Sequence, residues 1–190
     1  MEKAESEVIR AIKERRSIFK FAPQNVGMEK IQAILEAGRW APSWANTQPW
    51  EFVVVRDSAL KLKISDIVRD VTIVHSGFDG VSVIIVICTD PEKDPYHFVE
   101  DGAVATQNMA LAAHSLGLAS YWTGIFSGHN IKKNSAEQKV KEVLGIPKGY
   151  RVVALLPIGI PAYETQKTRN ELRDMTHYDQ FGNRRTDIET

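Results

Sequence analysis

Residues 40–50 read WAPSWANTQPW, and EFVVVR at residues 51–56 follows directly. The first segment has two prolines and three tryptophans without helical or strand periodicity, which is typical of an ordered loop. The valine-rich segment after it predicts a strand. Within the loop, Asn46 and Gln48 each offer an amide donor and acceptor that can read the edge of a flat heterocycle. The loop is therefore either a binding loop or a packed corner with buried tryptophans.

Outward from this loop, hydrophobic spacing and capping residues predict a series of helices and strands. Ser58 is expected to cap the third helix, and Ser135 to open a helix that ends at Gly145. The expected helices cover residues 6–14, 28–38, 58–68, 98–116 and 135–145. The expected strands cover residues 51–56, 81–89, 119–123 and 150–158. This loose alternation favours an α+β fold in a single domain, residues 1–190, that ends in an extended tail from about residue 160.

The composition excludes several classes of protein. The chain has 190 residues and carries 24 basic and 24 acidic side chains, so its formal net charge is zero. This balance argues against a nucleic-acid-binding protein and against a polybasic membrane-surface protein. A hydrophobic fraction of 43% with 25% charged residues is typical of a globular domain.

The single cysteine, Cys88, cannot form a disulfide within the chain, which fits a reducing compartment. No apolar run is long enough to span a bilayer, and the acidic N-terminus lacks the apolar core of a signal peptide. We therefore expect a cytoplasmic protein without a membrane partner.

Several common catalytic signatures are missing from the sequence. There is no glycine-rich dinucleotide or phosphate loop and no G-x-S-x-G nucleophile elbow. The five histidines are scattered, so no metal site is expected. Cys88 lies in the middle of a predicted strand, where we expect a buried structural thiol and not a nucleophile.

Two short cationic segments could bind an anion. Arg15 and Arg16, followed by Ser17, end the first predicted helix, where guanidinium groups offer bidentate donors to a phosphate. The alternative is that they complement the helix dipole. Lys167 and Arg169 are two residues apart in the tail, so in an extended chain they point the same way. The alternative for this pair is a solvated charged tail.

Together these segments resemble the FMN-dependent nitroreductase family, in the family's order, from Arg15 to about Tyr178. The matching pieces are residues 15–18 (RRSI), 41–43 (APS), 46–50 (NTQPW), 51–55, 101–102 (DG), 107–108 (QN), 117–118 (GL), 122–124 (WTG), 155–161 and 167–169 (KTR). The resemblance implies a mixed β-sheet flanked by helices. It also implies a homodimer with FMN bound at the interface and a C-terminal tail reaching onto the partner.

By that resemblance, Arg15, Arg16 and Ser17 would bind the phosphate, ribityl chain and ring edge of FMN. Lys167 and Arg169 would complete the phosphate clamp. One of the two arginines would also favour reduced FMN, because that state gathers negative charge near N1 and the C2 carbonyl.

The same resemblance places Pro42, Ser43 and Trp44 of the other subunit against the flavin ring, although Trp44 stands where the family commonly has a small residue. Asn46 and Gln48 would lie near the ring or brace their loop. A second departure is Phe19, which stands where the family often has Arg or Lys.

Backbone groups of Trp122, Thr123 and Gly124 would approach flavin N5 and the pyrimidine edge of the ring. The implied reaction is hydride transfer from NADH or NADPH to flavin N5, followed by reduction of a small-molecule acceptor such as a nitroaromatic or a quinone. One shared binding face implies a ping-pong order, and no side chain is assigned as a catalytic acid. The alternatives are the reductive dehalogenase or flavin-cleaving branch of the superfamily, a non-enzymatic FMN carrier or sensor, and a module without flavin.

Overall fold

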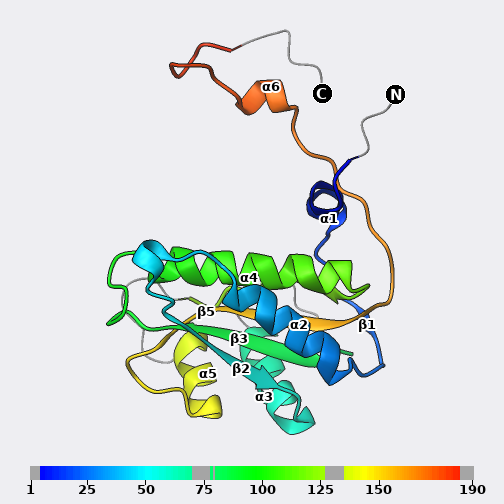
Figure 1. Cartoon of the computed structure of the whole chain (residues 1–190). Helices are drawn as coiled ribbons and strands as arrows, with labels where there is room; N and C mark the ends of the chain where they lie inside the picture. The colour runs from blue at the N-terminus through cyan, green and yellow to red at the C-terminus, as the bar shows by residue number, and fades with distance from the viewer. Residues whose placement is uncertain (1–4, 70–77, 79, 127–134, 185–190) are drawn as a thin grey trace.

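A computed structural model describes residues 5–69, 78, 80–126 and 135–184 of the chain (Figure 1). Its helices are α1 (Glu7–Glu14), α2 (Met28–Arg39), α3 (Ser58–Arg69), α4 (Phe98–Ser115), α5 (Ala136–Leu144) and α6 (Leu172–Met175), with a short 3₁₀ turn, η1 (Trp44–Asn46). Its strands are β1 (Phe21–Ala22), β2 (Trp50–Val55), β3 (Val83–Thr89), β4 (Ala119–Ser120) and β5 (Arg151–Pro161).

The strands form one sheet in the order β1-β5-β3-β2, with β4 also paired to β5. Every pair of named strands is antiparallel. Among the described residues, the parallel contact is the isolated bridge between Ser17 and Ser120. The α+β class and the helix-flanked sheet are confirmed, and the sheet is mixed only through that bridge.

Alternate residues of β3 face two separate layers of helices, as expected for a strand that is buried on both faces. Val83, Ile85 and Ile87 pack with Ile34 of α2 and Met109 of α4. The intervening side chains of β3 pack in a second core under α3 and α5. Figure 1 shows α2 and α4 on one face of the sheet and α3 and α5 on the other.

The helix ends largely follow local capping chemistry. Ser6 and Ser135 accept hydrogen bonds from Ile9 N and Gln138 N, and Gly145 ends α5 in the left-handed conformation. The expectation that Ser58 caps α3 is wrong. Asp57 is the cap, because its Oδ1 accepts a hydrogen bond from Leu60 N at 2.8 Å.

Helix α4 lies unusually close to the sheet and to α2 because glycines stand at the contacts. A Cβ atom on Gly102 would lie 2.9 Å from Cγ2 of both Thr89 and Val153. A Cβ atom on Gly38 would overlap Met109. These contacts fix α4 against the sheet and against α2.

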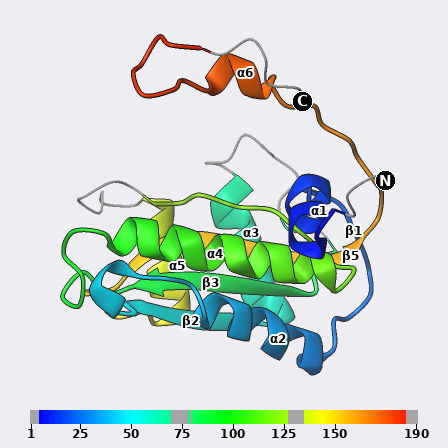
Figure 2. The same ribbon diagram turned by 45° about the horizontal axis from the view of Figure 1, so that its top comes forward.

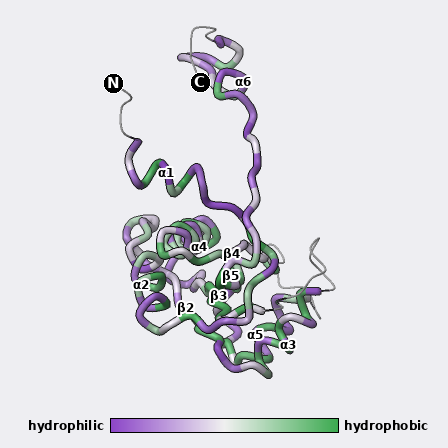
Figure 3. The backbone as a smooth tube through the Cα atoms, turned by 90° about the vertical axis from the view of Figure 1, so that its right-hand side faces the viewer, coloured by the Kyte–Doolittle hydropathy of each residue, from purple (hydrophilic) through white to green (hydrophobic). Residues whose placement is uncertain are grey.

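The tail that leads to α6 stands away from this body, and α1 projects from it while touching α4 through Glu14 and His114 (Figures 1 and 3). Neither helix has a buried residue. Val8, Ile9 and Ile12 of α1 remain at least 45% exposed, and Phe181 beyond α6 is 93% exposed. Among the described helices, none is both long and apolar enough to cross a membrane.

Candidate functional site

The sequence-predicted arginines lie where α1 ends and the chain enters the sheet. Arg15 caps α1 through its backbone N–H, which donates to Ala11 O. Two residues later, Ser17 forms the parallel bridge to Ser120 beside β5. Backbone pairing therefore holds the guanidinium groups next to the end of β4.

A pocket of about 950 Å³ opens at this place. Arg15, Arg16 and Lys167 all line it, together with Ser120. The tail reaches the pocket because its root is tied down: Ala162 N donates to Lys20 O at 3.1 Å, and Phe19 N donates to the Tyr163 hydroxyl at 3.3 Å. The structure thus brings together two cationic segments that are about 150 residues apart in the sequence.

Glu14 and Glu164 also line the pocket, but the electrostatics around Arg15 favour an anion. Burial, followed by the positive charges of Arg16 and Arg169, lowers the pKa of Arg15 below its ordinary value. Among the described ion pairs, none involves Arg15, Arg16, Lys167 or Arg169. The Nε of Arg16 is buried and has no hydrogen-bond partner within the described chain. An anion with several acceptor oxygens would satisfy that donor and relieve the repulsion, so the residues fit a flavin phosphate.

The second predicted segment is the loop around η1, and its backbone is strained. Ala45, Asn46 and Gln48 have φ values of 45°, 58° and 48°, which residues with a Cβ rarely adopt. Gln48 N donates to Ser43 Oγ at 2.9 Å, and Gln48 Nε2 donates to Asn46 Oδ1 at 3.1 Å. The two amides therefore brace their own loop, and such strain often marks a functional segment.

The loop is anchored to the start of α4, since Trp44 N donates to Asp101 Oδ1 at 3.1 Å. Pro42 is exposed, and the Trp44 side chain is 46% exposed. The cationic pocket contains His114, which lies in the last turn of α4. At a rise of 1.5 Å per residue, Asp101, which anchors the loop, and His114, which lines the pocket, are separated by about 20 Å along α4 (Figure 2). Within one chain, the structure does not bring the loop to the cationic pocket.

The third predicted segment, Trp122 to Gly124, continues from β4. Thr123 pairs with Leu155 of β5 through reciprocal backbone hydrogen bonds of 2.9 and 3.0 Å. The Thr123 side chain is buried and its Oγ1 has no partner among the described residues, whereas the Trp122 indole is 44% exposed. These residues follow Ser120, which lines the pocket, but they do not line it themselves.

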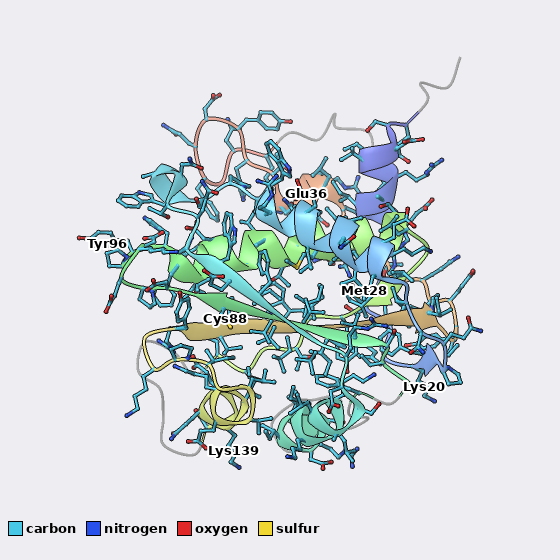
Figure 4. All side chains as sticks on the ribbon, turned by 60° about the horizontal axis from the view of Figure 1, so that its bottom comes forward. Lys20, Met28, Glu36, Cys88, Tyr96 and Lys139 are labelled. Carbon is cyan, nitrogen blue, oxygen red and sulfur yellow. The ribbon has the colours of Figure 1, made fainter. Side chains whose placement is uncertain are left out.

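Sequence reasoning missed His114 and Tyr163, which both line the pocket. The only signal for His114 is its place in the last turn of a long helix. Cys88 is buried as expected (Figure 4), and burial raises the pKa of its thiol to about 12. The described part of the chain holds no cluster of three metal-ligating side chains.

Comparisons with known proteins identify the family of the chain. The family model "Nitroreductase family" matches residues 12–77 and 75–160. A candidate NADH dehydrogenase/NAD(P)H nitroreductase of Methanothermobacter thermautotrophicus is 35% identical over 86% of this chain and 82% of its own. The crystal structure of a nitroreductase-like protein from Desulfovibrio desulfuricans in complex with FMN is 30% identical, with a TM-score of 0.75 over 94% of this chain and 99% of its own.

A more distant similarity is to the iodotyrosine deiodinase of Nematostella vectensis, which is 23% identical over 87% of this chain and 71% of its own. The family match, however, spans most of the chain, and the 35% identical relative is a candidate nitroreductase. The chain belongs to the nitroreductase family.

Proposed function

We propose that this protein is an FMN-dependent NAD(P)H oxidoreductase that reduces a nitroaromatic or quinone acceptor by a ping-pong mechanism. The observation that carries the proposal is the gathering of Arg15, Arg16 and Lys167 around one pocket, with Arg169 close enough for its charge to act on Arg15. Family membership and the FMN-bound relative supply the identity of the ligand.

The cationic pocket would hold the phosphate of FMN through charge-assisted hydrogen bonds from Arg15, Arg16 and Lys167. Ser17 and Ser120 would lie along the ribityl chain, and the Trp122 to Gly124 backbone would border the ring. When bound, FMN supplies the redox chemistry by accepting electrons from NAD(P)H and passing them to the acceptor. The residues from Trp122 to Gly124 would orient the ring, and Arg15 or Arg16 would add positive charge at its N1 edge.

The Trp44 loop completes this site only if it comes from a second copy, because the loop lies about 20 Å from the cationic pocket of its own chain. The exposed apolar side chains of α1 and α6 are the surfaces such a partner would cover. In addition, β2 has an open edge among the described strands, where a partner's extended tail could add. We infer a homodimer with two FMN sites, each built from both chains.

A second candidate acceptor is an aryl halide, favoured by the similarity to iodotyrosine deiodinases. In that reaction two electrons and one proton convert the aryl carbon–halogen bond to carbon–hydrogen and release halide. Release of iodide from an iodophenol under reducing conditions distinguishes this acceptor from nitroaromatics and quinones.

The direct test is spectroscopy and turnover of the purified protein. We expect a yellow preparation that releases FMN on denaturation and oxidises NADH or NADPH when a nitroaromatic or a quinone is present. A colourless protein that does not bind added FMN would overturn the proposal. A flavoprotein that oxidises neither nucleotide with any acceptor would instead be a carrier or sensor.

The homodimer has a separate test. Light scattering should give twice the 21.3 kDa of one chain. Ile9→Asp on the exposed face of α1 should shift this mass toward the monomer and weaken FMN binding in parallel, because a charge would be buried in the interface. The exposed Lys139 on α5, away from α1 and from the edge of β2, provides the control Lys139→Glu, which should leave both unchanged. A monomeric mass with FMN bound would contradict the shared site.

A further inference from the structure

A buried pair of carboxyl groups, Asp94 and Asp101, lies beneath the Trp44 loop. Asp94 is 0% exposed and Asp101 is 5% exposed. Asp94 Oδ1 accepts hydrogen bonds from Tyr96 N and His97 N, both at 2.9 Å, and Asp101 Oδ1 accepts one from Trp44 N at 3.1 Å. Each carboxyl group thus holds the backbone of a different segment.

The remaining oxygen of each carboxyl group has no N–H donor. Asp94 Oδ2 and Asp101 Oδ2 are both buried, without a hydrogen-bond partner within the described residues. The backbone of His97 joins the two residues, because its N–H donates to Asp94 Oδ1 and its carbonyl accepts from Asp101 N at 2.9 Å. Two ionised carboxylates held this way would repel each other, whereas one proton between them would give both free oxygens a partner.

The segments tied together by this pair carry three aromatic rings. The Trp44 ring centroid lies 5.9 Å from that of Tyr96, in an edge-to-face arrangement, and 5.8 Å from that of His97. Tyr96 is 72% exposed, and Figure 4 shows it at the edge of the molecule. We call Trp44, Tyr96 and His97 the aromatic wall. Exposed rings held by buried polar groups can contact a flat ligand.

We propose that Asp94 and Asp101 share one proton and act as positioning residues that hold the aromatic wall as one surface for flat aromatic acceptors. The acceptor role rests on the proposed function, because the Trp44 loop must face a flavin for its rings to meet an acceptor. The shared proton and the positioning of the wall belong to this chain alone.

The two pKa values move in opposite directions, as a shared proton requires. Burial raises the pKa of Asp101, and the hydrogen bond and charge of Asp94 add to the rise. Burial alone would raise the pKa of Asp94, but hydrogen bonds from His97 N, Tyr96 N and Asp101 together lower it. Among the described residues, His97 is the further titratable group whose charge acts on both carboxyls.

The sign of the pH effect follows from these directions. The stabilisation from Asp101, whose pKa is raised in the folded state, is lost as the pH rises through that value, when two carboxylates would face each other. The stabilisation from Asp94, whose pKa is lowered, is lost as the pH falls through its folded value. The wall should therefore be ordered between these limits and loosen on the alkaline side.

Amide substitutions test the shared proton. In Asp101→Asn, Oδ1 can still accept from Trp44 N and Nδ2 can donate to Asp94 Oδ2. In Asp94→Asn, Nδ2 can likewise donate to an ionised Asp101. In the double variant two NH₂ groups face each other without an acceptor between them. The quantity to compare is kcat/KM for a nitroaromatic acceptor. We expect it to stay within about twofold of the wild-type value in each single variant and to fall about tenfold in the double variant.

Measurements without turnover keep this test independent of the proposed reaction. Near neutral pH, infrared spectroscopy should show a protonated-carboxyl band in the wild type that is missing from each single variant. Below about pH 9, where tyrosine stays protonated, the near-ultraviolet circular dichroism of the aromatic wall should change with rising pH in the wild type and in His97→Gln, but not in Asp101→Asn. Ferricyanide turnover corrects for any change in flavin content, so the ratio of nitroaromatic to ferricyanide turnover should fall only in the double variant.

Three results would overturn the proposal. A missing carboxyl band in the wild type and an alkaline change that persists in Asp101→Asn would each remove the shared proton, and a double variant no worse than the sum of the single variants would remove the role of the wall toward the acceptor. If the infrared and dichroism results hold but no nucleotide is oxidised by the wild type, the positioning role stands and the proposed reaction fails. A third outcome is that the infrared and dichroism results hold, ferricyanide is reduced, and the double variant reduces the nitroaromatic at the wild-type rate. In that case the wall does not contact the acceptor.

Discussion

Arg15→Gln should weaken FMN binding by about a hundredfold while leaving the protein without FMN folded. The expected loss is about that of a charge-assisted contact, roughly 1.5–3 kcal/mol, because Arg15 lines the pocket and is partly buried. In the absence of an anion, its pKa is lowered by burial and by the charges of Arg16 and Arg169. Removing one of these crowded cations should therefore leave the stability of the FMN-free protein unchanged or slightly higher.

The combination of these two effects identifies a binding residue. Fluorescence titration with FMN gives the change in affinity, and thermal unfolding with and without FMN gives the change in stability. The control is Arg56→Gln, which removes an exposed arginine outside the pocket and should change neither quantity. Equal affinity in Arg15→Gln and the wild type would mean that the arginines only complement the end of α1.

Local chemistry explains which parts of the fold could be predicted. Helix α5 was predicted correctly because Ser135 and Gly145 act on their own neighbouring backbone. The cap of α3 was misassigned because Asp57 and Ser58 are adjacent and both side chains can cap a helix, so the starting residue depends on packing. The buried strand β3 was predictable because its apolar run does not alternate.

The candidate site was only partly predictable, for a physical reason. Arg15 and Lys167 could each be singled out by charge, but their meeting depends on β5 carrying the tail back to the start of the chain. Asp94 gave no signal, and Asp101 was noted only as part of the family-like piece at residues 101–102, because an acidic residue before or within the first turn of a helix is ordinary. Their pairing arises when the segment before α4 folds back over its first turn.

Glu137→Ala should cost about 3–5 kcal/mol of folding free energy without changing FMN affinity in the protein that remains folded. Glu137 is 0% exposed and forms a two-point ion pair with Arg151, with Oε1–Nε at 2.8 Å and Oε2–Nη2 at 3.0 Å. Its Oε1 also accepts a hydrogen bond from Val152 N at 3.1 Å. Loss of the Glu137 carboxylate would leave Arg151 buried without this counter-charge, with its guanidinium group over the ring of Phe126.

Urea unfolding measures this cost, and Glu142→Ala on the exposed face of α5 is the matched control, with an expected change within about 0.5 kcal/mol. The cost should also depend on pH. Burial lowers the pKa of Lys141, while the charge of Glu137 opposes that shift and the charge of Arg151 adds to it. Without Glu137 the pKa of Lys141 should fall further, so stability should recover as the pH rises and Lys141 loses its proton. A deficit that does not change with pH would show that Lys141 does not sense the missing carboxylate.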